Sequence, residues 1–394
     1  MRCLTALLSL SVVGSATPTT QGRTDSPKAH VKNGTYEGVD SAEYNQDFFL
    51  GILFAQPSGY SLLCVGYGEQ SEDCLYLNIV RPASYEHEQL PVGFWTHGGR
   101  FSNGGGGDQR YNLSFIVKQL VRIGKPMIGA SMNYRQSLWG FLHPNEVVGE
   151  GITNLGLRDQ RIALQIGAAS VGFQLTAHGG CGDNLFRAAI LQSGNPIYYG
   201  SENGTQRSQM GFEAIVSAVG CYSAWDRIQC LREVPFLTLN ATMNGSVGTG
   251  SFEPTIDGEF VQIDEGAWMS PMGVNTTKDF RATLSSFLPS SFQEAILKAY
   301  PDDLSVDVIA SLGDQHPAPP YGAQFRRSAS FWGDYYFIAS RRETENTWAS
   351  HSLPSYAYRF NAIPAGVPPE VGAGHYKEIG FCSTTSKGRG TDRI

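Results

Sequence analysis

Positive charge is scarce in this sequence. Of its 394 residues, 16% are charged, and 29 Lys and Arg stand against 36 Asp and Glu, which gives a formal net charge of −7. Proteins bind nucleic acid mainly through Lys and Arg side chains that neutralise phosphates. We therefore expect no nucleic-acid partner.

The sequence also lacks apolar runs long enough to span a bilayer, which takes about 20 residues in a helix. The apolar run 3–13 is too short, and it lies between Arg2 and a group of small residues around Ala16. This order is typical of a secretory signal peptide, and a buried N-terminal strand is the alternative. We predict a signal peptide over residues 1–17, a secreted (extracellular) protein and no stable membrane insertion.

Metal-binding cysteine patterns are absent, since the sequence has no CxxC and no Cys/His spacing typical of zinc. We expect no metal and no other cofactor. Of the seven cysteines, Cys3 belongs to the predicted signal peptide, and two pairs of the others are close in sequence. Short disulfide loops are the natural interpretation in an oxidising compartment. The predicted disulfides are Cys64–Cys74 and Cys221–Cys230, whereas Cys181 and Cys382 have no assigned partner.

Export would also make N-x-[ST] sequons available for glycosylation wherever they are exposed. Sequons are common by chance, so only their density supports export. The six candidates are Asn33, Asn112, Asn203, Asn240, Asn244 and Asn275.

Hydrophobic patterning predicts alternating strands and helices and no internal repeat. With 41% hydrophobic residues the chain can form a sizeable core, as two average domains or as one large α/β domain. Strands alternating with helices favour a mostly parallel sheet with helices on both faces. The predicted strands are 74–82, 90–99, 125–135, 185–194 and 354–363, and the predicted helices are 152–165, several within 206–300, and 326–351.

Several motifs occur in an order that resembles one family. The stretch SEDCLYLNIVRP (71–82) is similar to the second signature of the type-B carboxylesterase/lipase family, the serine ester hydrolases that include fungal lipases and cholinesterases. The resemblance implies an α/β-hydrolase fold over residues 18–382. The last residues, 383–394, are polar, and we expect them to form an unstructured tail. Further landmarks are PVGFWTHGGRFSNG, ASMNYRQSLWGFL, NLGLRDQRIALQ, LFRAAILQSGNP, IDEGAW and GHYKEIGF.

The resemblance implies a catalytic Ser, acid and His in that chain order. The acid would be Glu265, by its match to D-E-G, and the base would be His375, whereas a solvated Glu and a surface His are the simpler interpretations. The oxyanion loop would be HGGRF, with donors among Gly98, Gly99 and Arg100. Arg100 replaces a glycine of the family pattern, and we expect a strained turn if this position requires a positive φ. A flexible glycine-rich surface loop is the alternative.

This sequence lacks the segment that carries the nucleophilic serine in the family pattern. In the family a strand and a G-E-S-A-G elbow separate the D-Q-x-x-A-L-Q helix from the next helix, whereas here Gln165 is followed directly by IGAAS. Ser170 superficially resembles an elbow serine, but an elbow needs a preceding strand and a sharp turn. Ser193 has no catalytic role in the family pattern. The loop between the first two paired cysteines, the stretch before D-E-G and the elements after His375 are also shorter than the resemblance implies, so the expected fold is incomplete.

These observations lead to three functional hypotheses. The first is a secreted carboxylic-ester hydrolase of a Ser-Glu-His family, acting on small-molecule or lipid esters, in which this chain is inactive for want of its serine. The second is a non-catalytic binding or adhesion member of the same fold. The third is an incomplete gene product. The sequence does not determine the acyl chain, the alcohol or the oligomeric state.

Overall fold

The computed structural model describes most of the chain, and the statements below concern these residues. The described residues are 25–31, 34–54, 74–163, 168–180, 185–195, 204–245, 252–257, 261, 273–286, 288–306, 312, 315–317, 319–369 and 372–379. Glu265, Cys64, Asn33 and Asn203, the signal peptide and the 383–394 tail therefore lie outside them.

A five-stranded sheet forms the centre of the N-terminal half, in the order β3-β4-β5-β7-β6. Three of its strands fall where the sequence predicts them, and β7 is buried at four of its five residues, as a central strand should be. A separate hairpin, β1 and β2, precedes it. The bounds are β1 Lys28–Val31, β2 Gly34–Glu37, β3 Val39–Ser41, β4 Gln46–Leu53, β5 Tyr76–Pro82, β6 Val92–Thr96 and β7 Ile128–Met132.

The strand directions are mixed. β6 and β7 pair in parallel, whereas the pairs β3–β4, β4–β5 and β5–β7 are antiparallel. Among the described strands, the predicted parallel pairing therefore holds for β6 and β7 alone. The crossover between these two strands is α1 (Ser114–Arg122), which packs against β5 and β7. A parallel pair needs such a crossover, because a tight hairpin can join only antiparallel strands.

Two helices lie where the motif resemblance leaves no room for a nucleophile strand. α4 (Leu155–Ala163) falls within the predicted helix 152–165, and α5 (Ala168–Gly180) begins after only four further residues. The two helices contact each other, and Gln174 Nε2 on α5 donates to the Leu157 carbonyl on α4 at 2.9 Å. The two helix-like sequence patterns that adjoin here are thus two packed helices.

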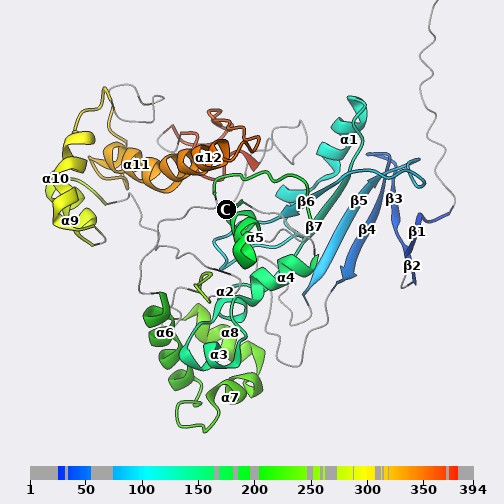
Figure 1. The fold of residues 1–394 in the computed structure, drawn as a ribbon, viewed down its shortest axis with the longest axis horizontal. Helices are drawn as coiled ribbons and strands as arrows, with labels where there is room; N and C mark the ends of the chain where they lie inside the picture. Colours follow the sequence, from blue (N-terminus) through cyan, green and yellow to red (C-terminus); the bar gives the residue numbers. More distant parts are fainter. Residues whose placement is uncertain are drawn as a thin grey trace, which may run out of the picture.

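The remaining helices form two groups (Figure 1). α3, α6, α7 and α8 lie below the sheet in that view, and α9, α10 and α11 lie at the far left. The predicted helix 326–351 is one continuous helical stretch, with a π-helical segment at Asp334–Ala339 between α11 and α12. The bounds are α2 Ser137–Phe141, α3 Asn145–Glu150, α6 Gly204–Ala218, α7 Arg227–Glu233, α8 Phe236–Asn244, α9 Thr277–Ser285, α10 Ser290–Ala299, α11 Phe325–Gly333 and α12 Ser340–Ser350.

Two predicted strands are wrong. Residues 185–194 and 354–363 form no strand, and the side chains of Ile190 and Tyr356 are 69% and 93% exposed. A strand exists only with a neighbour that satisfies its N–H and C=O groups. Among the described residues, neither segment pairs with a strand of the sheet, so the apolar pattern alone did not produce a ladder.

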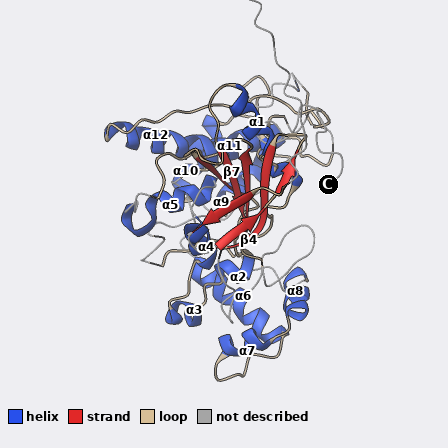
Figure 2. Cartoon of the chain, turned by 90° about the vertical axis from the view of Figure 1, so that its right-hand side faces the viewer, coloured by secondary structure: helices blue, strands red, loops and turns tan. Residues whose placement is uncertain are grey.

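The core is divided into two hydrophobic clusters, which lie in different parts of the molecule (Figures 1 and 2). The first joins the sheet to α2 and to α4–α8, with Met132, Trp139 and Phe212 almost fully buried. The second is aromatic and lies between α9, α11 and the π-helical segment, around Phe280 and Trp332. Among the described residues, no helix is both long and apolar enough to cross a membrane.

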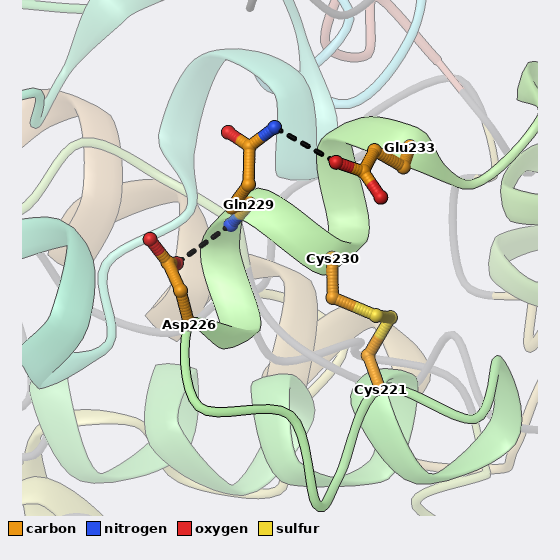
Figure 3. The surroundings of a disulfide bond; sticks show 5 residues. All are labelled: Cys221, Asp226, Gln229, Cys230 and Glu233. Atoms are coloured by element: carbon orange, nitrogen blue, oxygen red, sulfur yellow. Dashed lines mark hydrogen bonds between the residues drawn. A yellow bond between two sulfur atoms is a disulfide. The ribbon is translucent and has the colours of Figure 1, made fainter.

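One predicted disulfide is confirmed. Cys221, after α6, is bonded to Cys230 on α7 (Figure 3), and the Asp226 carboxylate caps α7 by accepting from the Gln229 N–H at 2.8 Å. A loop of this length stabilises the fold by about 2–3 kcal/mol in the chain-entropy model. Cys74 is disulfide-bonded as well, and its predicted partner Cys64 lies outside the described residues.

Candidate active site

The predicted oxyanion loop begins directly after β6. His97 is the first loop residue, with 3% of its surface exposed, and its ring stacks on Tyr134 with centroids 4.6 Å apart. Its Nδ1–H donates to the Gly98 carbonyl at 2.8 Å. Burial lowers the pKa of His97 from 6.5 to about 4, against smaller opposing effects of the Gly98 carbonyl and the Asp108 charge. His97 is therefore a neutral structural imidazole at pH 7.

The backbone of this loop adopts a conformation that favours glycine. Gly99 has φ 118°, and a Cβ there would lie 1.8 Å from the Asn103 carbonyl oxygen, so no other residue fits. Arg100 and Phe101 follow with φ 55° and 57°. A left-handed conformation costs an L-residue about 1–2 kcal/mol. The expectation that Arg100 would occupy a strained turn is thus confirmed.

The segment after β7 holds this turn in place through hydrogen bonds. Asn133 Oδ1 accepts from the Gly106 N–H at 2.7 Å, Gln136 Nε2 donates to the Asn103 carbonyl at 2.9 Å, and the Ser137 N–H donates to the Phe101 carbonyl at 2.6 Å. These three residues belong to the motif SMNYRQS, which explains why that motif accompanies the glycine-rich one.

A buried ion pair fixes the supporting segment in turn. Arg135 Nε donates to Asp159 Oδ2 on α4 at 2.7 Å, and Asp159 also accepts from the Arg135 backbone N–H. Asp159 is 1% exposed, so removal of either partner would leave a buried charge unpaired. Sequence reasoning identified both motifs but not this contact between them.

The predicted base, His375, lies in the loop 372–379. Its ring stacks on Phe337 of the π-helical segment with centroids 5.2 Å apart. Although part of the side chain remains exposed, the protein atoms packed around it lower the pKa of His375 below 6.5, while the charge of Glu378 raises it. A neutral imidazole that remains accessible has the properties of a general base.

The histidine loop docks onto the oxyanion loop through tyrosines. The hydroxyls of Tyr376 and Tyr111 form a hydrogen bond, and a Cβ built on Gly98 would lie 3.9 Å from the Tyr376 ring. The Arg110 guanidinium lies over the Tyr376 ring at 5.2 Å and binds both oxygens of Asp108. The structure therefore brings His375 and Gly98 into one region. No sequence pattern indicated these tyrosines, apart from Tyr376 being next to the histidine.

Glu378 holds the other side of the same loop. Its Oε1 accepts from the Ser193 hydroxyl at 2.9 Å, and Glu378 is 4% exposed. Asn195, two residues further on, donates from Nδ2 to Ser340 Oγ of α12 at 2.8 Å. The Ser193 hydroxyl thus donates a hydrogen bond to a carboxylate of the loop 372–379.

Two further residues are relevant to the predicted site, Glu265 and Ser170. Glu265 lies outside the described residues, between Val261 and Val274, which are both buried. Ser170 is the third residue of α5 and has helical backbone, unlike a serine on a sharp elbow. Within the part of the chain that the structure describes, no group of His, Cys, Asp and Glu side chains is arranged to hold a metal.

Comparisons with known proteins agree with this geometry. A family model described as the carboxylesterase family matches residues 59–166. Lipase 4 of Diutina rugosa is 30% identical over 369 positions, covering 78% of this chain and 65% of the lipase. Secreted lipase 1 of Botryotinia fuckeliana is 30% identical over 397 positions, covering 84% of this chain and 66% of the lipase. The chain thus spans slightly less than two thirds of the length of these relatives.

Part of that difference lies inside the matched region. The second alignment covers 84% of 394 residues, about 331 residues, yet it extends over 397 positions, so about 66 positions of the lipase have no counterpart within the aligned chain. The Inactive carboxylesterase-like protein VdtD of Byssochlamys spectabilis is 29% identical over 59% of this chain and 50% of its own length. The crystal structure of Aspergillus niger EstA has the same fold, with a TM-score of 0.72 and 22% identity over 92% of this chain and 84% of that chain.

Proposed function

Because this chain belongs to the carboxylesterase family, we propose that it is a secreted protein on an ester-hydrolase scaffold that has lost its nucleophile. It would keep the acid–base and oxyanion parts of the site and hydrolyse esters at a rate close to background. The observation that carries the proposal is the spacing of α4 and α5, which leaves four residues, none of them serine, for a strand and an elbow.

The chemistry explains why this loss is decisive. A serine hydroxyl becomes nucleophilic when a neighbouring imidazole takes its proton, and the acyl-enzyme forms on that oxygen. His375 and Glu265 are the proposed base and acid, and Gly98, Gly99 and Arg100 the proposed oxyanion loop. The backbone N–H after the serine, a further oxyanion donor in this family's architecture, would be lost with it. What remains can bind a ligand and polarise a carbonyl, but it has no covalent step.

A fluorophosphonate probe tests the proposal on the purified full chain, alongside hydrolysis of p-nitrophenyl hexanoate. We expect no covalent labelling, and an ester hydrolysis rate that is unchanged in His375→Ala. Ser170→Ala and Ser193→Ala serve as matched serine controls. Labelling that requires His375 and disappears in one serine variant would identify a nucleophile and overturn the proposal.

Secretion and glycosylation form part of the same proposal. The similarity to Secreted lipase 1 supports export, with residues 1–17 as the signal peptide. Asn112, Asn244 and Asn275 are exposed, Asn240 is half-buried, and all four are candidate glycosylation sites. Small-molecule or lipid esters, or the acids derived from them, are the proposed ligands.

Two alternative functions are each favoured by a different observation. The similarity to the Inactive carboxylesterase-like protein VdtD favours a non-catalytic member that binds a ligand on this scaffold. The roughly 66 lipase positions without a counterpart favour an incomplete gene product with skipped coding segments. Transcript sequencing separates them, because reads that restore a G-x-S-x-G segment would show that the missing blocks belong to the protein.

A further inference from the structure

We propose that the turn formed by Gly99, Arg100 and Phe101 binds an organic carboxylate, with the Arg100 guanidinium as its charged partner, and so prefers an acid over the corresponding ester or amide. This proposal rests on the proposed function in one respect, because it assigns the ligand site to the oxyanion loop. It goes further by naming the ligand class and the residue that selects it.

The backbone of the turn offers donors to an anion. Gly99, Arg100 and Phe101 have successive positive φ angles of 118°, 55° and 57°. The Gly99 carbonyl is used within the turn, since it accepts from the N–H groups of Ser102 and Asn103 at 3.1 Å. Among the hydrogen bonds between described residues, none has the N–H of Gly99 or Phe101 as donor. Backbone N–H groups gathered in a turn of this kind favour negative charge.

The side chain of Arg100 places a cation at the same turn. It is 47% exposed, and its Nε donates to Glu253 Oε1 at 2.7 Å, where Glu253 is 15% exposed. This contact shows that a carboxylate fits against the guanidinium at this place. Arginine presents a planar fork of donors that matches a carboxylate in bidentate fashion, whereas a neutral ester offers only weaker contacts.

The strain at Arg100 has a functional interpretation in this context. Glycine would adopt the same φ without strain, whereas a residue with a Cβ adopts it only with strain. The surroundings hold the turn in place through Gln136 and Ser137, so the arginine is fixed with little freedom to relax. A strained residue held in this way at a ligand site points to a role for its side chain.

A second arginine near this turn, Arg110, makes its contacts within the protein. Arg110 binds both oxygens of Asp108 and lies over the Tyr376 ring, so its charge serves the contact between the two loops. Arg100 pairs with the Glu253 carboxylate while its side chain stays 47% exposed, so a ligand carboxylate can displace or accompany that of Glu253. The negative charge of Glu253 then limits the affinity of the turn for a carboxylate ligand. Replacing Glu253 with its neutral isostere glutamine should raise that affinity.

The test compares hexanoate with its neutral analogue hexanamide by isothermal titration at pH 7, using the full chain. We expect hexanoate to bind at least 10-fold more tightly than hexanamide. Arg100→Ala should abolish the difference, Arg100→Lys should keep a smaller one, and Glu253→Gln should tighten hexanoate about 3- to 10-fold. Arg122→Ala, which removes the same charge from the exposed face of α1, is the matched control and should have no effect.

A second measurement locates the ligand. In ¹⁵N-labelled protein, hexanoate should shift the amide resonances of Gly99 and Phe101, and Arg100→Gly, which relieves the strain and preserves the turn, should remove these shifts. Equal binding of acid and amide, or shifts confined to other amides, would overturn the carboxylate proposal. Its failure is separate from that of the proposed function, which falls only if a labelled serine and ester turnover are found.

Discussion

Single residues at the start of the 97–106 loop determine its shape and its charge. Gly99 is required by the 1.8 Å approach that any Cβ would make to the Asn103 carbonyl oxygen, and Arg100 carries the strain of a left-handed conformation. His97 closes the base of the loop, buried against Tyr134. Its protonation state therefore couples the solution pH to the stability of the site.

We predict that stability falls between pH 6.5 and pH 4 because of His97. Above pH 6.5 the imidazole is neutral in both the folded and the unfolded chain. Below 6.5 the unfolded chain takes up the proton first, because burial lowers the folded-state pKa to about 4. The free energy of unfolding should decrease across this window by up to about 3 kcal/mol.

Urea unfolding at a series of pH values measures this slope. The pKa values of His143 and His375 are also lowered, so His97→Asn should reduce the slope without abolishing it. An identical slope in the parent and the variant would show that His97 titrates normally in the folded chain.

Elements of the fold depend on neighbours that the chain does not always provide. β6 and β7 pair in register from Val92 with Ile128 to Thr96 with Met132, and they form as predicted. Residues 185–194 and 354–363 have comparable apolar patterns but form no ladder. A β-pattern is therefore necessary for a strand but is not sufficient, because its backbone groups need partners.

Hydrogen–deuterium exchange should separate these segments. Peptides covering 185–194 and 354–363 should exchange fully at the earliest time points, because their N–H groups are not held in a ladder. Peptides covering β7, which is buried and paired on both sides, should stay protected and serve as the internal control. Protection of residues 185–194 equal to that of β7 would mean that this run pairs with a neighbour in solution.

The core of the molecule comprises two hydrophobic clusters, each formed by a different set of helices and strands (Figure 1). A parallel sheet that loses a central strand leaves neighbours with unpaired N–H and C=O groups, each costing about 1–3 kcal/mol when buried. Total stability is only about 5–15 kcal/mol. We therefore expect low soluble expression and weak cooperativity between the clusters.

Unfolding followed at one tryptophan in each cluster tests this expectation. Trp139 lies in the first cluster and Trp332 in the second, 3% and 4% exposed. In protein labelled with 5-fluorotryptophan, ¹⁹F resonances assigned through Trp139→Phe and Trp332→Phe should show different urea midpoints. Coincident midpoints together with a single sharp thermal transition would indicate one cooperative unit.

The family resemblance, the strands β5, β6 and β7, the helices around α4 and α5, and the spacing that leaves no room for a nucleophile elbow could all be predicted from the sequence alone. These features follow from local patterns and from the order of motifs, which survive without knowledge of distant contacts. The strained turn at Arg100 could also be predicted, because Arg100 replaces a glycine of the family pattern.

Which apolar patterns form strands, and how the loops contact each other, depends on contacts between distant parts of the chain. The tertiary structure pairs Arg135 with Asp159 and Tyr111 with Tyr376, sets Phe337 against His375, and leaves Ile190 and Tyr356 exposed. The physical reason is that ladders, buried ion pairs and ring stacks join residues far apart in sequence. No local pattern shows whether a distant partner is present, and two predicted strands, 185–194 and 354–363, pair with none among the described residues.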